Sequence, residues 1–262
     1  MMLLTLLLAS GCAWRRAPVV DARAVALTTA DAQFAARAGP ADVDAAVEVW
    51  SAILARDPSD GEVLARLAHA EWVRAQLSVP GEALGHFEVG EEYGWRCLVG
   101  IAAFDAARRA HGGRVSDEVV AAVGAERAPC LVWTAVHAVE RVGLRGGGAT
   151  LALEEARVLL ARARELGAEP SPWSPVPGLV DWAEARVGWA SARGDVEESA
   201  ARRALVAVAD RHPGVAHWAC DARRAGEERE APEQDRTPEG EALRGRWAAC
   251  RAADDGSAGD EP

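Results

Sequence analysis

The segment that most resembles a nucleotide-binding motif is Gly143–Thr150, with the sequence GLRGGGAT. It fits the phosphate-loop pattern G-x4-G-x-T, in which backbone amides surround phosphates and a lysine contacts those being transferred. Position 149 is alanine where that lysine is needed, and a predicted helix precedes the segment where the motif requires a strand. The alternative interpretation, which we favour, is a turn between two helices with Thr150 as the N-cap of the second.

A second group with the right residue types for chemistry is His212, His217 and Cys220, which could ligate a metal ion. The spacing of His217 and Cys220 suits one helical face, but His212 precedes a proline outside that helix and no fourth ligand is evident. The sequence also contains no H-E-x-x-H, G-x-S-x-G or C-x2-C pattern. We therefore expect no metal site, no cofactor and no enzymatic activity.

One predicted helix, residues 129–144, carries polar and aromatic side chains opposite a stripe of aliphatic residues. Trp133, His137 and Glu140 lie at positions i, i+4 and i+7 and so share one face. A helix with two such faces is suited to lining a cleft for a ligand or partner. Four further tryptophans on other predicted helices could complete the cleft: Trp72, Trp95, Trp182 and Trp189. The alternative is that all these side chains fill space between helices as large core residues.

The N-terminus resembles the signal peptide of a bacterial lipoprotein. Residues 1–10, MMLLTLLLAS, form an apolar run too short to cross a bilayer, and Gly11 and Cys12 follow. This pattern resembles a lipobox, in which the cysteine is acylated and becomes the new N-terminus. The resemblance implies export and a lipid anchor at Cys12, and Ala13 after it implies the periplasmic side of the outer membrane. The alternative is a short buried helix with a free cysteine.

Without Cys12, four cysteines remain, and an oxidising compartment would allow two disulfides in three connectivities. We expect Cys97–Cys130 and Cys220–Cys250, because the members of each pair lie on neighbouring predicted helices. Buried free thiols are the alternative.

Composition favours an all-α protein. Alanine is abundant, whereas residues that favour strands are few, with three Phe and one Tyr beside ten Trp. A net charge of -11 argues against a nucleic-acid surface, which needs cations to neutralise phosphates.

The predicted helices share a repeat register. In 41–56, the spacing of Ala46, Trp50, Ile53 and then Pro58 resembles the second helix of a tetratricopeptide repeat. The same spacing recurs in two later predicted helices, each preceded by a helix that carries tryptophan: Ala156, Leu160 and Ala163 in 149–168, and Ala200, Ala204 and Ala207 in 195–213. The sequence thus predicts antiparallel helix pairs stacked as a tetratricopeptide-like α-solenoid.

The chain divides into five regions by pattern and composition. After a signal peptide (1–11) we expect a tether and first helix (12–39), then the tetratricopeptide-like domain (40–221), which includes one long helix over about 82–111. A charged linker (222–238) and a short C-terminal helix with a disordered tail (239–262) follow. The short helix, 239–252, carries Leu243, Trp247 and Cys250 and is expected to dock back on the domain.

Three segments in this order resemble the T-component (TatT) family of tripartite ATP-independent periplasmic (TRAP) transporters: EEYGWRCLVG, APCLVWTAVHAVERVGL and GDVEESAARRALVAVADRHPG. The resemblance covers residues 40–215 and is strongest at Ala128–Leu144 and Trp182–Pro213; after 215 the sequence departs from the family by becoming charged. It implies a periplasm-facing lipoprotein with a tetratricopeptide-like fold that binds the transporter's solute-binding subunit and an apolar ligand. A homo-oligomer is compatible with it. The alternative is a general tetratricopeptide scaffold for protein–protein interaction in the cell envelope.

Overall fold

The computed structural model describes residues 21–37, 39–78, 80–145, 150–167 and 178–212, and all regular structure within these ranges is helical. The expected all-α class is therefore confirmed for the described part of the chain. The helices are α1 (Ala22–Ala35), α2 (Pro40–Leu54), α3 (Gly61–Leu77), α4 (Pro80–Val99), α5 (Ala102–Ala110), α6 (Asp117–Val120), the 3-10 helix η1 (Ala125–Arg127), α7 (Ala128–Leu144), α8 (Thr150–Glu165), α9 (Leu179–Ala190) and α10 (Asp195–Arg211).

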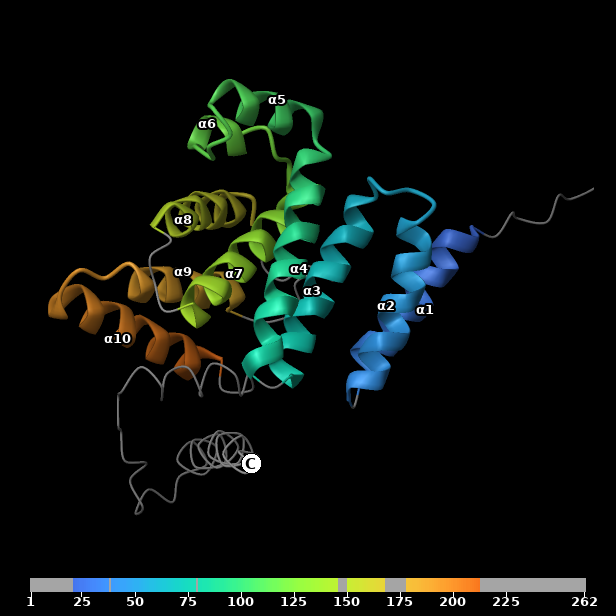
Figure 1. Ribbon diagram of the computed structural model, residues 1–262, viewed down its shortest axis with the longest axis horizontal. Helices are drawn as coiled ribbons and strands as arrows, with labels where there is room; N and C mark the ends of the chain where they lie inside the picture. Colours follow the sequence, from blue (N-terminus) through green and yellow to red (C-terminus); the bar gives the residue numbers. More distant parts are fainter. Residues whose placement is uncertain (1–20, 38, 79, 146–149, 168–177, 213–262) are drawn as a thin grey trace, which may run out of the picture.

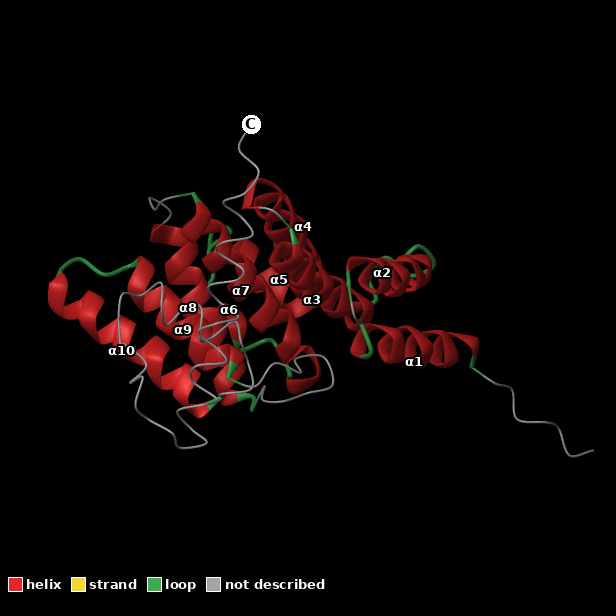
Figure 2. Ribbon diagram, turned by 90° about the horizontal axis from the view of Figure 1, so that it is seen from below, coloured by secondary structure: helices red, strands yellow, loops and turns green. Residues whose placement is uncertain are grey.

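The longer helices pack in the order in which they occur in the sequence. From α1 to α4 each helix contacts the next, α4 then contacts α7, and α7 to α10 again pack in sequence. Two views of the molecule place α1 and α2 at one end and α10 at the other (Figures 1 and 2). The short helices α5, α6 and η1 connect α4 to α7 at one edge of the array.

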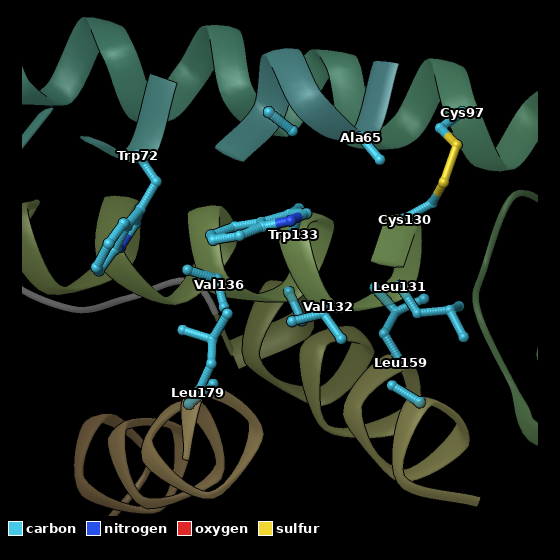
Figure 3. Close-up of a cluster of buried hydrophobic side chains, with 14 of the residues drawn as sticks. Ala65, Trp72, Cys97, Cys130, Leu131, Val132, Trp133, Val136, Leu159 and Leu179 are labelled. Atoms are coloured by element: carbon cyan, nitrogen blue, oxygen red, sulfur yellow. A yellow bond between two sulfur atoms is a disulfide. The ribbon is translucent and has the colours of Figure 1, made fainter. Parts of the chain in front are cut away.

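Helix α7 lies at the centre of the molecule. It contacts α3 and α4 on one side and α8 and α9 on the other (Figure 3), and its residues 128–140 are all buried. Leu131, Val132, Trp133 and Val136 point in different directions around the helix, and all four are fully shielded from solvent. A helix that is buried on every side is packed as part of the core.

A disulfide between Cys97 and Cys130 joins the C-terminal end of α4 to the first turn of α7 (Figure 3). Both cysteines are buried, and their Cα atoms lie 5.9 Å apart. This is one of the two pairings expected from the sequence. The other, Cys220–Cys250, lies outside the described residues.

The prediction of one helix over about 82–111 is wrong, because the chain bends between α4 and α5. Gly100 follows the last residue of α4, and Ile101 adopts an extended conformation with φ -87° and ψ 104° before α5 begins. Glycine has a low helix propensity, and Phe104 on α5 becomes fully buried after the bend. The free energy gained by burying this ring exceeds the free energy that a longer, exposed helix would gain.

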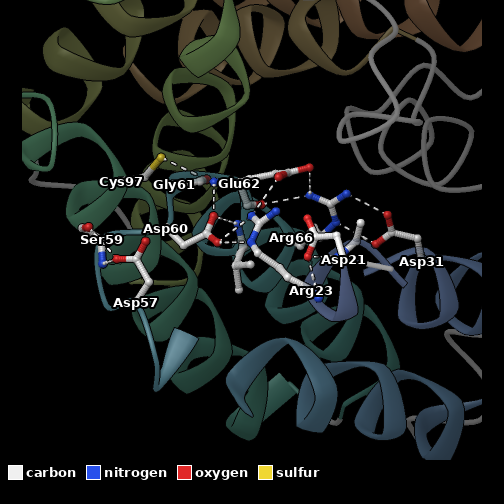
Figure 4. Close-up of polar contacts among 12 residues, drawn as sticks. Asp21, Arg23, Asp31, Asp57, Ser59, Asp60, Gly61, Glu62, Arg66 and Cys97 are labelled. Carbon is white, nitrogen blue, oxygen red and sulfur yellow. Dashed lines mark hydrogen bonds and ion pairs between the residues drawn. The ribbon is translucent and has the colours of Figure 1, made fainter. Parts of the chain in front are cut away.

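Helix α1 is held to α3 by paired charges (Figure 4). Arg23 on α1 donates to Asp60 and Glu62 at the start of α3, at distances of 2.5–2.9 Å. Asp60 also accepts hydrogen bonds from the amides of Glu62 and Val63, and it is therefore the N-cap of α3. Arg66 on α3 forms a two-point contact with Asp31 of α1.

None of the described helices combines the length and apolar character that crossing a bilayer requires.

Candidate partner-binding groove

The tryptophans and histidine expected to line a cleft lie instead in a buried aromatic cluster. Trp133 has no exposed surface, and its ring lies near Trp72 of α3 at 6.0 Å and near His137 at 6.3 Å between centroids. The imidazole of His69 stacks on Trp133 at 4.5 Å with an interplanar angle of 14°. Three rings from α1, α2 and α4 extend the cluster: Phe34, Trp50 and Phe87.

Both histidines of this cluster are held in the neutral form. Burial lowers the pKa of His69 to about 3, and the nearby charges of Arg37 and of a protonated His137 lower it further. Burial also lowers the pKa of His137 to about 4, although its hydrogen bond to the Ala68 carbonyl acts in the opposite direction. His137 Nε2 donates this bond at 2.8 Å, and its Nδ1 finds no hydrogen-bond partner among the described residues. Both imidazoles are therefore uncharged in the folded core at neutral pH.

Three of the other residues expected in the cleft, Trp182, Trp189 and Glu140, meet around Arg186 of α9, whereas Trp95 lies elsewhere. Trp182 is fully buried on α9, and Trp189 is partly buried and lies 5.3 Å from the guanidinium of Arg186. Glu140, 7% exposed, pairs with the same Arg186 at 3.3 Å and so links α7 to α9. Trp95, near the C-terminal end of α4, packs against Arg108 of α5.

The predicted cleft is therefore not assembled by the residues named for it. Trp133, His137 and Trp182 have no exposed surface, and Trp72 and Glu140 are nearly as buried. The alternative interpretation, in which large aromatic side chains fill the space between helices, agrees with these positions. The cause is that α7 has helices on both of its faces, which a single helical pattern cannot reveal.

Several other residues singled out from the sequence lie outside the described part of the chain: Cys12, His217, Cys220 and Cys250. Of the segment Gly143–Thr150, the first two residues end α7 and Thr150 begins α8, so its described part follows a helix. Within the described residues, no group of three or more His, Cys, Asp or Glu side chains has the arrangement of a metal site.

An open groove lies between α8 and α10, with α9 as its floor. It encloses about 850 Å³. Small residues predominate where α9 and α10 face it, with Ala185 and Gly188 on α9. The α10 wall presents a stripe of alanines over about two turns: Ala200, Ala201, Ala204 and Ala207.

Ion pairs fix the three helices around the groove. Asp181, in the first turn of α9, pairs with Arg164 of α8 at 2.5 Å and with Arg211 of α10 at 2.9 Å. Arg164 also forms a two-point contact with Glu184, and these carboxylates raise its pKa above the ordinary arginine value. At the other end, Arg157 of α8 donates to the hydroxyl of Ser191. The carboxylates are thus engaged with arginines and are poorly placed to act as an acid–base pair.

Sequence analysis identified the alanines of α10 but assigned them to packing. The equivalent register positions in α2 and α8 are buried, with Ala46 and Trp50 in α2 and Ala156 and Leu160 in α8 at 0–1% exposure. In α10 the corresponding residues are instead exposed toward the groove: Ala200, Ala204 and Ala207. The repeat spacing shows which residues of α10 share a face, but it could not indicate that no described helix covers that face.

A second hollow, about 790 Å³, lies beside the disulfide, between the start of α3, the start of α7 and the residues after α8. Its walls carry both signs of charge, including Arg23, Asp60 and Arg127. Arg23 and Asp60 already pair with each other. Because its charges serve to hold α1 against α3, we consider the α8–α10 groove the better candidate.

No family model matches this chain, and neither a curated protein nor a solved structure shows significant similarity to it. The functional argument therefore rests on the groove and on the residues quoted for the family resemblance.

Proposed function

We propose that this chain is a non-enzymatic accessory lipoprotein of a TRAP-type transporter, anchored through Cys12 on the periplasmic side of the outer membrane. Its partner is the transporter's solute-binding subunit. The groove between α8 and α10 is the observation that carries this proposal, because an open surface with small side chains and charged ends is suited to receiving part of another protein. The apolar ligand that the resemblance implies is not part of this proposal, because the tryptophans expected to line a cleft for it are mostly buried.

Helix packing supports a tetratricopeptide-like arrangement within this proposal. The first helices of three pairs, α3, α7 and α9, contact one another in turn, and each packs on its own second helix, α4, α8 or α10. Each of α4 and α8 also contacts the first helix of the following pair. Stacked helix pairs of this kind use extended surfaces to bind proteins.

The position of the groove also supports the proposal. α1 and α2 lie at one end of the array, and α10 lies at the other (Figure 2). An anchor on the residues before α1 would hold that end near the membrane, so the groove would face the periplasm.

The direct test is binding of the full chain to a TRAP-type solute-binding subunit from the same organism. Ala204→Trp places an indole in the groove at an exposed position, whereas Ser199→Trp adds the same side chain at an exposed α10 position that does not line it. We expect Ala204→Trp to weaken binding by about tenfold or more, as loss of a central contact does, and Ser199→Trp to leave it unchanged. Calorimetric titration measures both.

Equal affinity of the two variants would remove the groove from the binding surface. If the unmodified chain bound no solute-binding subunit and instead recovered outer-membrane assembly factors, the general scaffold would replace the transporter proposal. The anchor has its own test: radiolabelled palmitate should enter the unmodified protein and fail to enter Cys12→Ala.

A further inference from the structure

Helix α10 has an apolar face that no described element covers. Leu205, Val208 and Ala209 are buried where α10 packs on α9. Ala200, Ala204 and Ala207 lie on the groove side and remain exposed. The same register positions are buried in α2 and α8, so this stripe has the composition of a helix-packing face without a helix on it.

The size of the groove matches a short helix. Its lining positions on α10 run from Glu197 to Arg211, a length of about 21 Å at 1.5 Å per residue. Alanine and glycine on the floor and wall let a second backbone approach closely, and they leave space for one bulky side chain such as tryptophan. Gly188 has only Ala201 near the position of a Cβ atom, so the floor is not already filled.

The chain carries one such helix sequence beyond α10. Residues 239–252 have the same length as the groove face, with Leu243, Trp247 and Cys250 on one helical stripe at i, i+4 and i+7. A helix of this length is only marginally stable alone in water and needs a surface for its stripe. Arginines flank the stripe, and the groove lining carries charges of both signs, with the carboxylates of Glu154, Asp181, Glu184 and Glu197 beside Arg157, Arg193 and Arg211.

Connectivity favours this segment over a second copy of the chain. Residues 213–238 connect the end of α10 to the segment, and a link of that length can reach any point of the groove, since an extended chain spans about 3.3 Å per residue. The segment is thereby held near the groove at an effective concentration of about 1 mM, far above that of a free partner.

We propose that residues 239–252 form a helix that docks in the groove between α8 and α10, with Leu243 and Trp247 directed toward the alanine stripe of α10. The docked helix closes the array and competes with any protein that binds the same groove. This docking goes beyond the proposed function, because it requires no transporter subunit.

Disulfide trapping tests the docking in the full chain. With Cys12 and Cys220 replaced by serine, Cys250 is the one thiol outside the Cys97–Cys130 disulfide, and a second is introduced at Ala207→Cys in the groove. Ser199→Cys is the matched control, because Ser199 is exposed on α10 but does not line the groove. We expect mild oxidation to link Cys250 to position 207 within one chain at least about tenfold more than to position 199, as proximity dictates. Peptide mass spectrometry identifies the link.

Equal linking at both positions, or none at either, overturns the proposal. Links between two chains in place of links within one would assign the groove to a second copy, and this too overturns it.

A second measurement keeps the test independent of introduced cysteines. Trp247→Asp places a charge on the stripe, whereas Ala248→Asp places the same charge about 100° around the helix, outside the stripe. We expect faster amide hydrogen exchange in α9 and α10 in Trp247→Asp and no change in Ala248→Asp. Unchanged exchange in both variants contradicts the docking. Binding of the solute-binding subunit is measured separately, so docking and the transporter proposal can fail independently.

Discussion

The surroundings of α7 and those of the groove are both formed by helix pairs, but they differ in the size of the side chains between the helices. Around α7 the space is filled by Trp133, Trp72 and two histidines, and little of any of them is exposed. In the groove between α8 and α10 the apolar lining of α9 and α10 is mostly alanine and glycine, charged side chains surround it, and about 850 Å³ remains open. Large aromatic residues thus mark the closed part of this protein, and small residues mark the surface available to a partner.

Glycines show the same contrast at the level of the backbone. A Cβ atom on Gly90 of α4 would lie 2.1 Å from the imidazole of His137, and one on Gly94 would lie 2.9 Å from the Thr134 Cα. These glycines let α4 approach α7 closely. A Cβ atom on Gly188, in the groove floor, would meet only the Ala201 methyl at an ordinary 3.6 Å.

The largest effect is expected from Trp133→Ala, which removes the central ring of the closed region. We expect the free energy of unfolding to fall by about 4 kcal/mol, the loss typical of a buried tryptophan. Urea denaturation followed by circular dichroism measures it. Trp189→Ala, at a partly exposed position against Arg186, is the control and should cost about 1 kcal/mol. Equal losses would mean that the two regions do not differ in packing.

Loss of the Cys97–Cys130 disulfide should be the next largest effect. The cysteines are 33 residues apart, and closing a loop of that length stabilises a fold by about 3.5 kcal/mol in the chain-entropy model. We expect a reducing agent to lower the denaturation midpoint of the unmodified chain. In a Cys220→Ser background, which excludes the other expected pairing, the double variant Cys97→Ala, Cys130→Ala should begin at the lower midpoint and show no response to the reducing agent. If complete reduction left the denaturation midpoint of the unmodified chain unchanged, this prediction would be wrong.

Lowering the pH should reduce the free energy of unfolding through the two buried histidines near α7. The unfolded chain takes up protons below pH 6.5, whereas in the folded protein the pKa of His137 is about 4 and that of His69 about 3. Stability is thus retained above pH 6.5 and falls as the pH drops below it, by about 2 kcal/mol for each histidine at pH 5.

The test compares unfolding at pH 7.5 and pH 5. His69→Phe keeps an aromatic ring beside Trp133 but cannot be protonated, so the loss between the two pH values should shrink by about 2 kcal/mol. An unchanged pH dependence in His69→Phe would show that this imidazole is accessible to protons.

The smallest expected effect is a change in stability that has opposite signs in the two regions. Gly188→Ala should stabilise the protein by about 0.8 kcal/mol, because alanine has the higher helix propensity and the groove has space for its methyl group. Gly94→Ala should destabilise it, since overpacking against α7 costs about 1–3 kcal/mol and exceeds that gain. Thermal denaturation of both variants gives the signs, and the same sign in both would remove the contrast.

Sequence by itself determined the helical class and most helix positions, because a helix repeats every 3.6 residues and its apolar spacing is local. It also led to the expectation of the Cys97–Cys130 pair, since those residues lie on helices that follow one another. It did not predict the bend at Gly100, where burial of Phe104 depends on elements distant in the sequence.

Only the tertiary structure decided which face of each helix is covered. Trp133 and His137 have the spacing of a cleft-lining face, but α3 and α4 cover that face while α8 and α9 cover the other. Ala200, Ala204 and Ala207 have the spacing of a packing face, yet no described helix lies on them. A helical pattern specifies which residues share a face, whereas burial of that face depends on neighbours that the pattern does not contain.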